Sequence, residues 1–280
     1  MNKRSKFYDK EFSNKAIELF KKGLSSKQIS EQLCISKTAL IRNLNLLGYN
    51  FDRSKSMQKY TINRNYFEHI DSNDKAYWLG LIYADGCNKV DRNTFVLGLV
   101  EEDSYILEIL KKDLESTVPI KIQNNNRNSN NKKFHRLELY NKKICLDLVK
   151  HGVVQNKTSV LKAPEIKNKY IYDFIRGYFD GDGSIVSYII NKKNNYKDSI
   201  SFTGTKEITD FIKLFLKKEL NIHCCTYERH PDRDNNNYTI SINGRLNVIK
   251  LCDKMYKNKN KRFLKRKYKK YLKIKNRYER

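Results

Sequence analysis

Residues Trp78–Gly86 read W-L-G-L-I-Y-A-D-G, and residues Ile175–Gly183 read I-R-G-Y-F-D-G-D-G. Each stretch has a glycine, then a small residue four positions later, then Asp and Gly. The two stretches are far apart in the chain, so the space between them can hold a set of helices and strands. Two related copies in one chain indicate a duplicated structural unit.

Each copy is expected to be a short helix that ends at its last glycine in the left-handed conformation. Gly80 and Ala84 lie on one face of such a helix, and the second copy repeats this spacing. Small residues at this spacing let two helix backbones approach closely. Crossing the two helices would bring Asp85 and Asp182 together at helix C-termini, where negative charge is unfavourable. Divalent cations relieve that repulsion, whereas two ordinary Asp-Gly turns are the alternative interpretation.

Both stretches resemble the LAGLIDADG motif of homing endonucleases, and the two-copy layout is similar to the single-chain, pseudo-symmetric members of that family. The matching positions are Gly80, Leu81, Ile82, Ala84, Asp85 and Gly86 in the first copy, and Gly177, Asp180, Asp182 and Gly183 in the second. The chain departs from the family at Tyr83, where the family often has Asp, and at Arg176, where it has a small residue. Arg176 is expected to point away from the helix pair.

The resemblance implies a chemistry and a set of residues for it. Asp85 and Asp182 would be catalytic and would hold Mg²⁺ (or Mn²⁺), which is the arrangement of two-metal phosphodiester hydrolysis. The family has an Asn-Lys-Thr/Ser element whose lysine lies near the scissile phosphate, and Lys157 matches it as a third catalytic residue. A surface lysine without a role is the alternative for Lys157. Three lysines remain open as its counterpart in the second half: Lys261, Lys265 and Lys267.

The composition favours a polyanionic partner. The 280 residues include 57 Lys and Arg against 31 Asp and Glu, a formal net charge of +26. Nucleic acid is the first candidate for such a charge. No apolar run approaches the roughly 20 residues that span a bilayer, and no signal peptide is recognised at the N-terminus. We therefore expect no membrane attachment and a cytoplasmic, nucleoid or organellar location. The six cysteines show no C-x-x-C pair and are expected to be reduced thiols rather than zinc ligands.

Residues 13–48 predict three short helices, the third of them capped by Ser36. The tight turn before that helix resembles the resolvase- and homeodomain-like helix-turn-helix family, in which the third helix enters the major groove. The resemblance implies that Lys37, Thr38 and Arg42 face DNA, while a protein-docking module is the alternative. We assign residues 1–52 to this helix-turn-helix domain and residues 53–73 to a basic linker.

The apolar pattern after each motif predicts one order twice, namely helix, two strands, helix, two strands, helix. The predicted fold class is α+β, with two pseudo-symmetric αββαββα repeats and an N-terminal all-α helix-turn-helix domain. The first repeat covers residues 74–162, and the second, with a basic C-terminal helix, covers residues 163–280. In the resembled family such repeats form a saddle-shaped sheet that straddles a DNA duplex.

Alternation along the predicted strands separates core residues from candidate DNA contacts. For example, Ile200 and Phe202 are expected to point inward. The candidates for DNA contact are Lys121, Gln123, Arg136, Glu138, Ser199, Ser201, Thr203, Tyr227, Arg229, Thr239 and Ser241. Ordinary solvated strand faces are the alternative for each of them.

Together these patterns predict a site-specific, metal-dependent double-strand DNA endonuclease. It would act as a monomer on long double-stranded DNA. The target is expected to be non-palindromic, because the two halves have diverged. The alternative is a catalytically silent protein of the LAGLIDADG fold that binds nucleic acid, either an RNA splicing maturase or a DNA-binding regulator.

Overall fold

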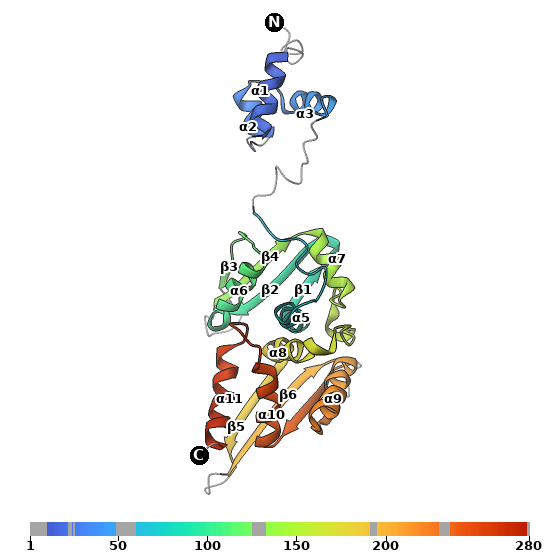
Figure 1. The fold of residues 1–280 in the computed structure, drawn as a ribbon, viewed down its shortest axis with the longest axis vertical. Helices are drawn as coiled ribbons and strands as arrows, with labels where there is room; N and C mark the ends of the chain where they lie inside the picture. The colour runs from blue at the N-terminus through green and yellow to red at the C-terminus, as the bar shows by residue number, and fades with distance from the viewer. Residues whose placement is uncertain are drawn as a thin grey trace. The chain divides into compact units, whose positions relative to one another are not determined.

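The computed structural model describes residues 10–21, 24, 26–48, 60–124, 133–190, 195–229 and 236–278. The chain forms two compact units, Met1–Thr61 and Ile62–Arg280 (Figure 1). The first part of the predicted linker, residues 53–59, lies outside the described residues. Among the residues described, every helix is too short or too polar to cross a lipid bilayer.

The N-terminal unit contains three helices, α1 (Lys10–Lys21), α2 (Ser26–Gln32) and α3 (Lys37–Leu46). Their buried side chains form a small apolar core of Ala16, Ile29, Leu33, Leu40 and Leu44. The Ser36 hydroxyl accepts a hydrogen bond of 3.2 Å from the Ala39 amide and caps α3 as predicted. The first helix begins at Lys10, three residues earlier than predicted. The predicted helices are therefore present, while their role in DNA binding stays a prediction.

The second unit repeats one order of elements twice, as predicted. The first half consists of α5 (Asn73–Asp85), β1 (Gly86–Lys89), β2 (Thr94–Val100), α6 (Tyr105–Asp113), β3 (Lys121–Asn124), β4 (Lys133–Tyr140) and α7 (Lys142–Lys150). The second half consists of α8 (Ile171–Asp182), β5 (Gly183–Ile189), β6 (Tyr196–Gly204), α9 (Lys206–Leu220), β7 (Cys225–Glu228), β8 (Tyr238–Asn243) and α10 (Arg245–Tyr256). The last helix is α11 (Lys265–Tyr278). The α+β fold with two αββαββα repeats is confirmed.

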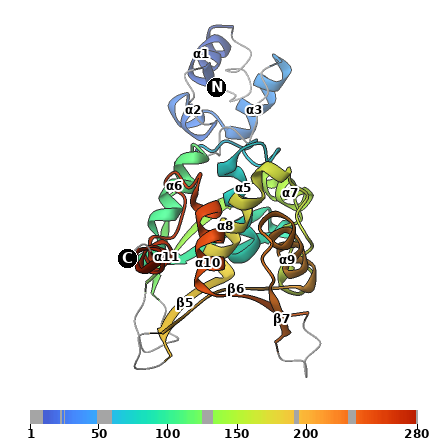
Figure 2. The same cartoon turned by 60° about the horizontal axis from the view of Figure 1, so that its bottom comes forward.

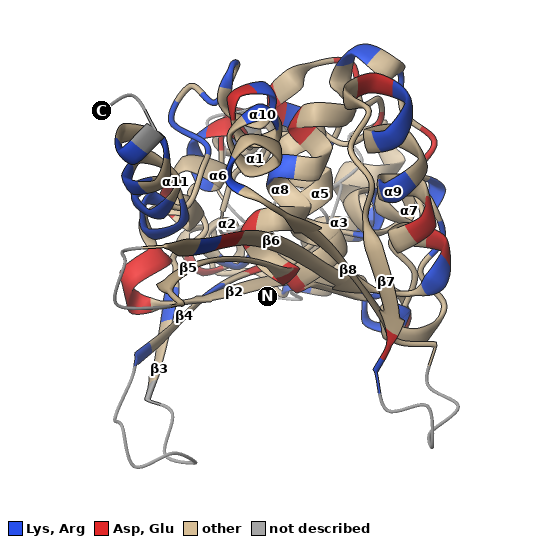
Figure 3. Ribbon diagram, turned by 90° about the horizontal axis from the view of Figure 1, so that it is seen from below, with Lys and Arg blue, Asp and Glu red and all other residues tan. Residues whose placement is uncertain are grey.

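Each half forms a four-stranded antiparallel sheet, in the order β1-β2-β4-β3 or β5-β6-β8-β7. One face of each sheet is covered by helices, as the second half shows in Figure 2, where α8, α9 and α10 lie above β5, β6 and β7. The opposite faces form the inside of an arch, with β3 and β7 descending on its two sides (Figure 3). We call this inner side the concave face.

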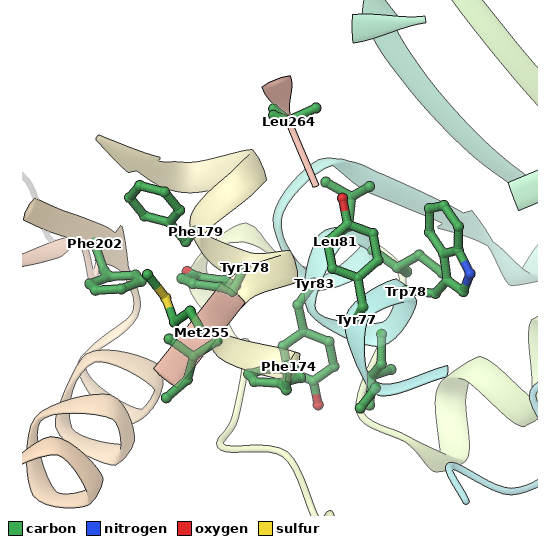
Figure 4. Packing of buried hydrophobic residues seen from close by; sticks show 14 of the residues in the cluster. Tyr77, Trp78, Leu81, Tyr83, Phe174, Tyr178, Phe179, Phe202, Met255 and Leu264 are labelled. Carbon is green, nitrogen blue, oxygen red and sulfur yellow. The ribbon is translucent and has the colours of Figure 1, made fainter. Parts of the chain in front are cut away.

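The motif helices α5 and α8 lie at the centre of one continuous apolar core. Figure 4 shows their aromatic side chains packed between the two halves. Tyr83 and Phe174 pack edge to face, with ring centroids 5.1 Å apart, and the Tyr83 hydroxyl donates a 2.6 Å hydrogen bond to the His151 carbonyl. Trp78 donates to Asp113 at 2.7 Å. Burying each large side chain of this kind stabilises the fold by about 1.5–3 kcal/mol, so the helix pair joins the halves firmly.

Residues 257–264, which we call the C-terminal strap, return from α10 across the motif helices. The Arg262 guanidinium binds the Asp113 carboxylate at 2.6 and 2.7 Å and Asp74 at 3.1 Å. Arg176 is fully buried and donates to the Met255 carbonyl at 2.6 Å and to the Arg262 carbonyl at 3.1 Å. Its guanidinium also lies over the Tyr77 ring of the partner helix. The expectation that Arg176 points away from the helix pair is therefore wrong, because it fastens the strap to that pair.

Helix α11 covers the open edge of β5. Lys267 donates to the Gly183 carbonyl at 2.5 Å and Lys270 to the Ile185 carbonyl at 3.5 Å. Arg277 donates to the Ser187 hydroxyl at 2.8 Å. Edge strands carry unpaired backbone groups that favour aggregation, and cationic side chains are one way to protect them. The basic tail is helical as predicted, but the helix begins at Lys265 because the strap comes first.

Candidate active site

The motif helices cross with their backbones in direct contact. A Cβ atom on Gly80 would lie 2.0 Å from the Phe174 carbonyl oxygen. A Cβ atom on Gly177 would lie 2.0 Å from the Tyr77 carbonyl oxygen. Only glycine fits at either position without moving the opposing helix. The predicted close approach through small residues is confirmed.

This crossing brings the C-terminal residues of the two helices, Asp85 and Asp182, together. A Cβ atom on Gly181 of α8 would lie 3.0 Å from the Asp85 Oδ2, so the Asp85 side chain reaches the end of the partner helix. Burial, and then the negative charge of Asp182, raise the pKa of Asp85 to about 6. Burial also raises the pKa of Asp182. Both side chains nevertheless remain accessible to solvent, which screens their repulsion and leaves them open to a ligand.

The glycines after the two acids are not left-handed, so this part of the prediction is wrong. Gly86 has φ −74° and ψ 142°, and Gly183 has φ −90° and ψ 158°. These are extended conformations that any residue adopts. Space explains the glycines instead, since a Cβ on Gly86 would lie 2.6 Å from the Ile82 carbonyl oxygen and one on Gly183 would lie 2.3 Å from the Phe179 ring. The chain passes directly from helix to strand, and each acid lies at that junction.

One lysine lies at the end of each motif helix. Lys157 donates a 2.8 Å hydrogen bond to the Ala84 carbonyl of α5. Lys267 is buried and donates to carbonyls at the end of α8, namely Phe179 at 2.5 Å, Asp180 at 2.8 Å, Gly181 at 3.4 Å and Gly183 at 2.5 Å. Burial lowers the pKa of Lys157 and lowers that of Lys267 to about 8. Of the three lysines that the sequence left open, Lys267 is the one found at this helix end.

The acids offer oxygen ligands that suit a hard divalent cation. Within the described residues, no cluster of three or more His, Cys, Asp or Glu side chains could hold a metal ion. A zinc or calcium site built from protein ligands alone would need such a cluster. Mg²⁺ is usually held by one or two carboxylates, waters and substrate phosphates. The Asp85–Asp182 pair therefore suits a hard divalent cation that takes its remaining ligands from outside the protein.

The stretch from residue 169 to residue 256 matches the sequence model of a domain family described as the LAGLIDADG-like domain. The chain contains a LAGLIDADG-like domain. The matched stretch holds α8 to α10, and the elements α5 to α7 repeat its element order and its sheet topology. The comparison with curated protein sequences gave no significant match.

The comparison with solved structures found several similar chains. The meganuclease I-SmaMI bound to uncleaveable DNA is 14% identical, with a TM-score of 0.49 over 71% of this chain and 88% of that chain. The LAGLIDADG homing endonuclease I-LtrWI bound to target DNA is 13% identical, with a TM-score of 0.47 over 78% and 91% of the two chains. The homing endonuclease I-WcaI bound to its recognition sequence is 16% identical, with a TM-score of 0.48 over 81% and 96%.

The concave face of the first half is a network of charged side chains. Glu138 accepts hydrogen bonds from Lys121 and, at 3.2 Å, from the Tyr140 hydroxyl. Arg136 binds Glu138 at 3.0 Å and the Gln123 side-chain oxygen at 3.0 Å. The hydrogen bond from Lys121 and the neighbouring cations lower the pKa of Glu138. The four predicted contact residues of this sheet are thus brought together, with basic groups at the surface.

The concave face of the LAGLIDADG-like domain carries mainly hydroxyl side chains in place of such a network. Ser199, Ser201, Thr203 and Ser241 are partly exposed there, and Tyr227 and Arg229 are exposed. The core face carries Ile200, Phe202, Ile240 and Ile242, all fully buried, as the alternation predicted.

Thr239 also lies on the concave side but is only 4% exposed, which contradicts its expected exposure. Its strand β8 is internal to the sheet, so Thr203 and Tyr227 flank Thr239 on the neighbouring strands. The hydroxyls of Thr203 and Thr239 share a hydrogen bond of 3.0 Å. Thr239 therefore holds the Thr203 hydroxyl in place, and its own side chain is too buried to form part of the concave surface.

The helix-turn-helix candidates Lys37, Thr38 and Arg42 are all exposed on α3. The cysteines within the described residues are free: Cys34, Cys87, Cys145, Cys224, Cys225 and Cys252. Within the described part of the chain these cysteines take part in no cluster of three or more metal-binding side chains, and their reduced state stays a prediction.

Sequence reasoning missed the support behind the acids. Asp180 is buried and accepts a 3.0 Å hydrogen bond from the Tyr77 hydroxyl of α5 and a 2.9 Å hydrogen bond from the Leu264 amide of the strap. Burial raises the pKa of Asp180 to about 6, and Lys267 opposes that rise. Asp180 therefore holds α5, α8 and the strap together beside the site. Its match to the family motif was the one available signal, since nothing in the sequence named its partners.

Proposed function

We propose that the chain is a site-specific double-strand DNA endonuclease that hydrolyses one phosphodiester bond on each strand. The observation that supports this proposal best is the pair of solvent-accessible acids, Asp85 and Asp182, at the crossing of two glycine-packed helices. Two juxtaposed carboxylates destabilise a fold unless a cation joins them. A protein that only binds nucleic acid has no need of such a pair.

In this proposal Asp85 and Asp182 hold Mg²⁺ or Mn²⁺ and orient the water molecules that attack the two strands. A cation held there would supply Lewis-acid activation of the phosphodiester and would stabilise the negative charge that develops on it. The raised pKa of Asp85 is relieved when a cation binds, because positive charge favours the ionised carboxylate. The crossing of α5 and α8 fixes the separation of the two acids, so the packing of these helices would determine the distance between the two cuts.

The two lysines take different roles. An ammonium group has three hydrogens to donate. Lys157 gives one to the Ala84 carbonyl, which leaves two for the phosphate or for the attacking water. Lys267 is close to four carbonyls of α8 and the start of β5, so its donors are used within the protein. We assign Lys157 to the reacting phosphate and Lys267 to positioning the helix end that carries Asp182.

The concave face would bind the duplex. Its first half offers Lys121 and Arg136 at a preformed charged network, and such side chains suit phosphates and guanine edges. Its second half offers hydroxyls and Tyr227, which suit a different base sequence. This asymmetry supports a long, non-palindromic target and a monomeric enzyme. The helix α3 would add a separate contact through Arg42 and its neighbours, with residues 1–52 as a helix-turn-helix domain.

A cleavage selection from a randomised duplex library tests the proposal. The full chain is incubated with the library and Mg²⁺, and cut molecules are sequenced. We expect one family of long, non-palindromic sites with a cut in each strand, and no molecules cut in both strands with Asp182→Asn. Binding without cleavage by the unaltered chain would instead favour the silent binding protein.

A further inference from the structure

A cavity of about 800 Å³ lies where α11 meets the outer part of the β5–β6 hairpin, away from Asp85 and Asp182. Figure 1 shows α11 lying along β5 in this region. The cavity is lined by Val186, Ser187, Tyr188, Tyr196, Lys270, Lys273, Asn276 and Arg277. Pockets of this volume are the size of ordinary small-ligand sites. The proposed cleavage reaction makes no use of it.

Several polar groups of the cavity have no partner within the protein. Among the described residues, nothing forms a hydrogen bond or an ion pair with the Lys273 ammonium, the Asn276 amide or the Tyr188 hydroxyl. Tyr188 is 51% exposed, which is high for an aromatic side chain at a sheet edge. The cavity thus presents a cation, an amide and an aromatic ring that are all free to meet a ligand.

The neighbouring Arg277 is fixed, and it makes the cavity basic. Its guanidinium lies 3.7 Å from the centre of the Tyr196 ring and donates to the Asp198 carboxylate at 2.7 Å. Arg245 also binds Asp198, at 3.3 Å, so two cations share this buried acid. No acidic side chain lines the cavity. The site therefore favours an anion.

The cavity is continuous with the concave face around the edge of the second sheet. Val186 is paired with Ser199, and Tyr188 with Lys197, so both cavity residues lie on the concave side. Tyr196 is paired with Ile189 on the opposite side of the same hairpin. A nucleic-acid strand that leaves the concave face at this edge would meet one tyrosine from each side.

We propose that this cavity binds an unpaired stretch of polynucleotide. A base would stack on Tyr188, while Lys273 and Lys270 would neutralise the adjoining phosphates. Stacking on tyrosine needs an open base face, which a duplex hides, so we favour unpaired nucleotides over a duplex. Asn276 would bind the base edge. The inference rests on the cavity and holds whether or not the chain cleaves DNA.

Fluorescence anisotropy with a labelled oligothymidylate of about 12 nucleotides, in the presence of EDTA, tests this site in the full chain. We expect Tyr188→Ala to weaken binding about 10-fold, whereas Tyr188→Phe keeps the ring and binds as the unaltered chain does. Lys273→Gln should reduce the slope of log K against log salt by about 0.7, the value for one phosphate contact on a single strand. The matched control is Lys254→Gln, which removes the same charge from the exposed side of α10.

The outcomes separate the possibilities. Equal binding by the unaltered chain, Tyr188→Ala and Lys273→Gln would overturn the proposal. An equal change of the salt slope in Lys254→Gln and Lys273→Gln would also overturn it, since the oligonucleotide would then bind to the basic surface as a whole and not to the cavity. Complete displacement by an excess of duplex, with no effect of Tyr188→Ala, would place the oligonucleotide on the concave face and would also overturn it. A parallel series with oligouridylate shows whether DNA or RNA is preferred. Thermal melts confirm that each variant folds.

Discussion

Replacing Gly177 with alanine should force the two motif helices apart. The added Cβ would lie 2.0 Å from the Tyr77 carbonyl oxygen and 2.7 Å from the Leu81 amide nitrogen, both of them backbone atoms. Real Cβ atoms essentially never come closer than 3.0 Å to such neighbours, so the helices must separate by about 1 Å. Backbone atoms cannot rotate away as side chains do, and the whole helix has to move.

The expected losses of stability and of activity follow from this displacement. Overpacking a core costs about 1–3 kcal/mol, and we expect the upper end, about 3 kcal/mol, because the clash is with backbone atoms. For a unit of this size that corresponds to a melting temperature about 6–12 °C lower. Cleavage should fall about 100-fold beyond the effect on folding, because a displacement of about 1 Å changes the distance between the catalytic acids.

Urea unfolding and calorimetry measure the stability, and cleavage of a selected target site measures the activity. Gly181→Ala serves as the matched comparison, because its Cβ would lie 2.2 Å from the Ala84 Cβ, a side-chain atom. Adding Ala84→Gly should therefore restore most of the stability lost in Gly181→Ala, while it should not rescue Gly177→Ala. If Gly177→Ala unfolds within about 0.5 kcal/mol of the unaltered chain, the close backbone packing described above is wrong.

Lys157→Met should leave the free energy of unfolding unchanged but reduce cleavage about 100-fold. Lys267→Met should lower the free energy of unfolding by about 2 kcal/mol, since several carbonyls of α8 lose their donor. Urea unfolding and strand-resolved cleavage distinguish the two variants, and equal effects on both measurements would contradict the different roles. At a subsaturating concentration of Mg²⁺, cleavage should decline about tenfold per pH unit below about 6, because metal-free Asp85, with its pKa of about 6, takes up a proton and binds cations less well. A pH–rate profile that is flat between pH 5 and 7 under this condition would exclude the effect. Without divalent cations the same raised pKa makes ionised Asp85 unfavourable to the fold above about pH 6, and this penalty disappears as the pH falls towards 4, so Asp85→Asn should stabilise the protein in EDTA at pH 7 but not at pH 4. Arg262→Gln should destabilise the chain by about 2 kcal/mol, because it removes the charged hydrogen bonds that fix the strap; an unchanged urea midpoint would show that the strap is not held this way.

The repeated fold could be predicted from the sequence because its signals are local. The spacing of Gly80 and Gly177 before their acids, and the alternation around Ile200 and Phe202, each follow from helix or strand geometry alone. The same order of helices and strands was predicted after each motif, and this repetition supported the assignment of both halves. The left-handed conformation predicted for the glycines after the acids was wrong. A sequence pattern reveals that a glycine is present, but it does not show whether the backbone conformation or the lack of space for a Cβ atom requires it.

The support of the site could not be predicted, because it depends on contacts between distant segments. Lys267 reaches the end of α8 only because the strap crosses the motif helices, and the sequence offers other lysines nearby with no feature to choose among them. Arg176 looked like a surface residue by type, yet it is fully buried and binds one carbonyl of α10, that of Met255, and one of the strap, that of Arg262. Thr239 followed the strand alternation correctly and was still buried, because exposure depends on the neighbouring strands as well as on the face.

Strand cleavage and DNA binding measured side by side, with Asp182→Asn as the matched variant, decide whether the paired acids form a nuclease site. On a selected target with Mg²⁺, the unaltered chain should cut both strands and lose this activity in EDTA. Asp182→Asn should bind the same DNA as tightly and cut neither strand or only one at an appreciable rate. If the unaltered chain and Asp182→Asn bind equally and neither one cuts, the paired acids are not the active site of an endonuclease.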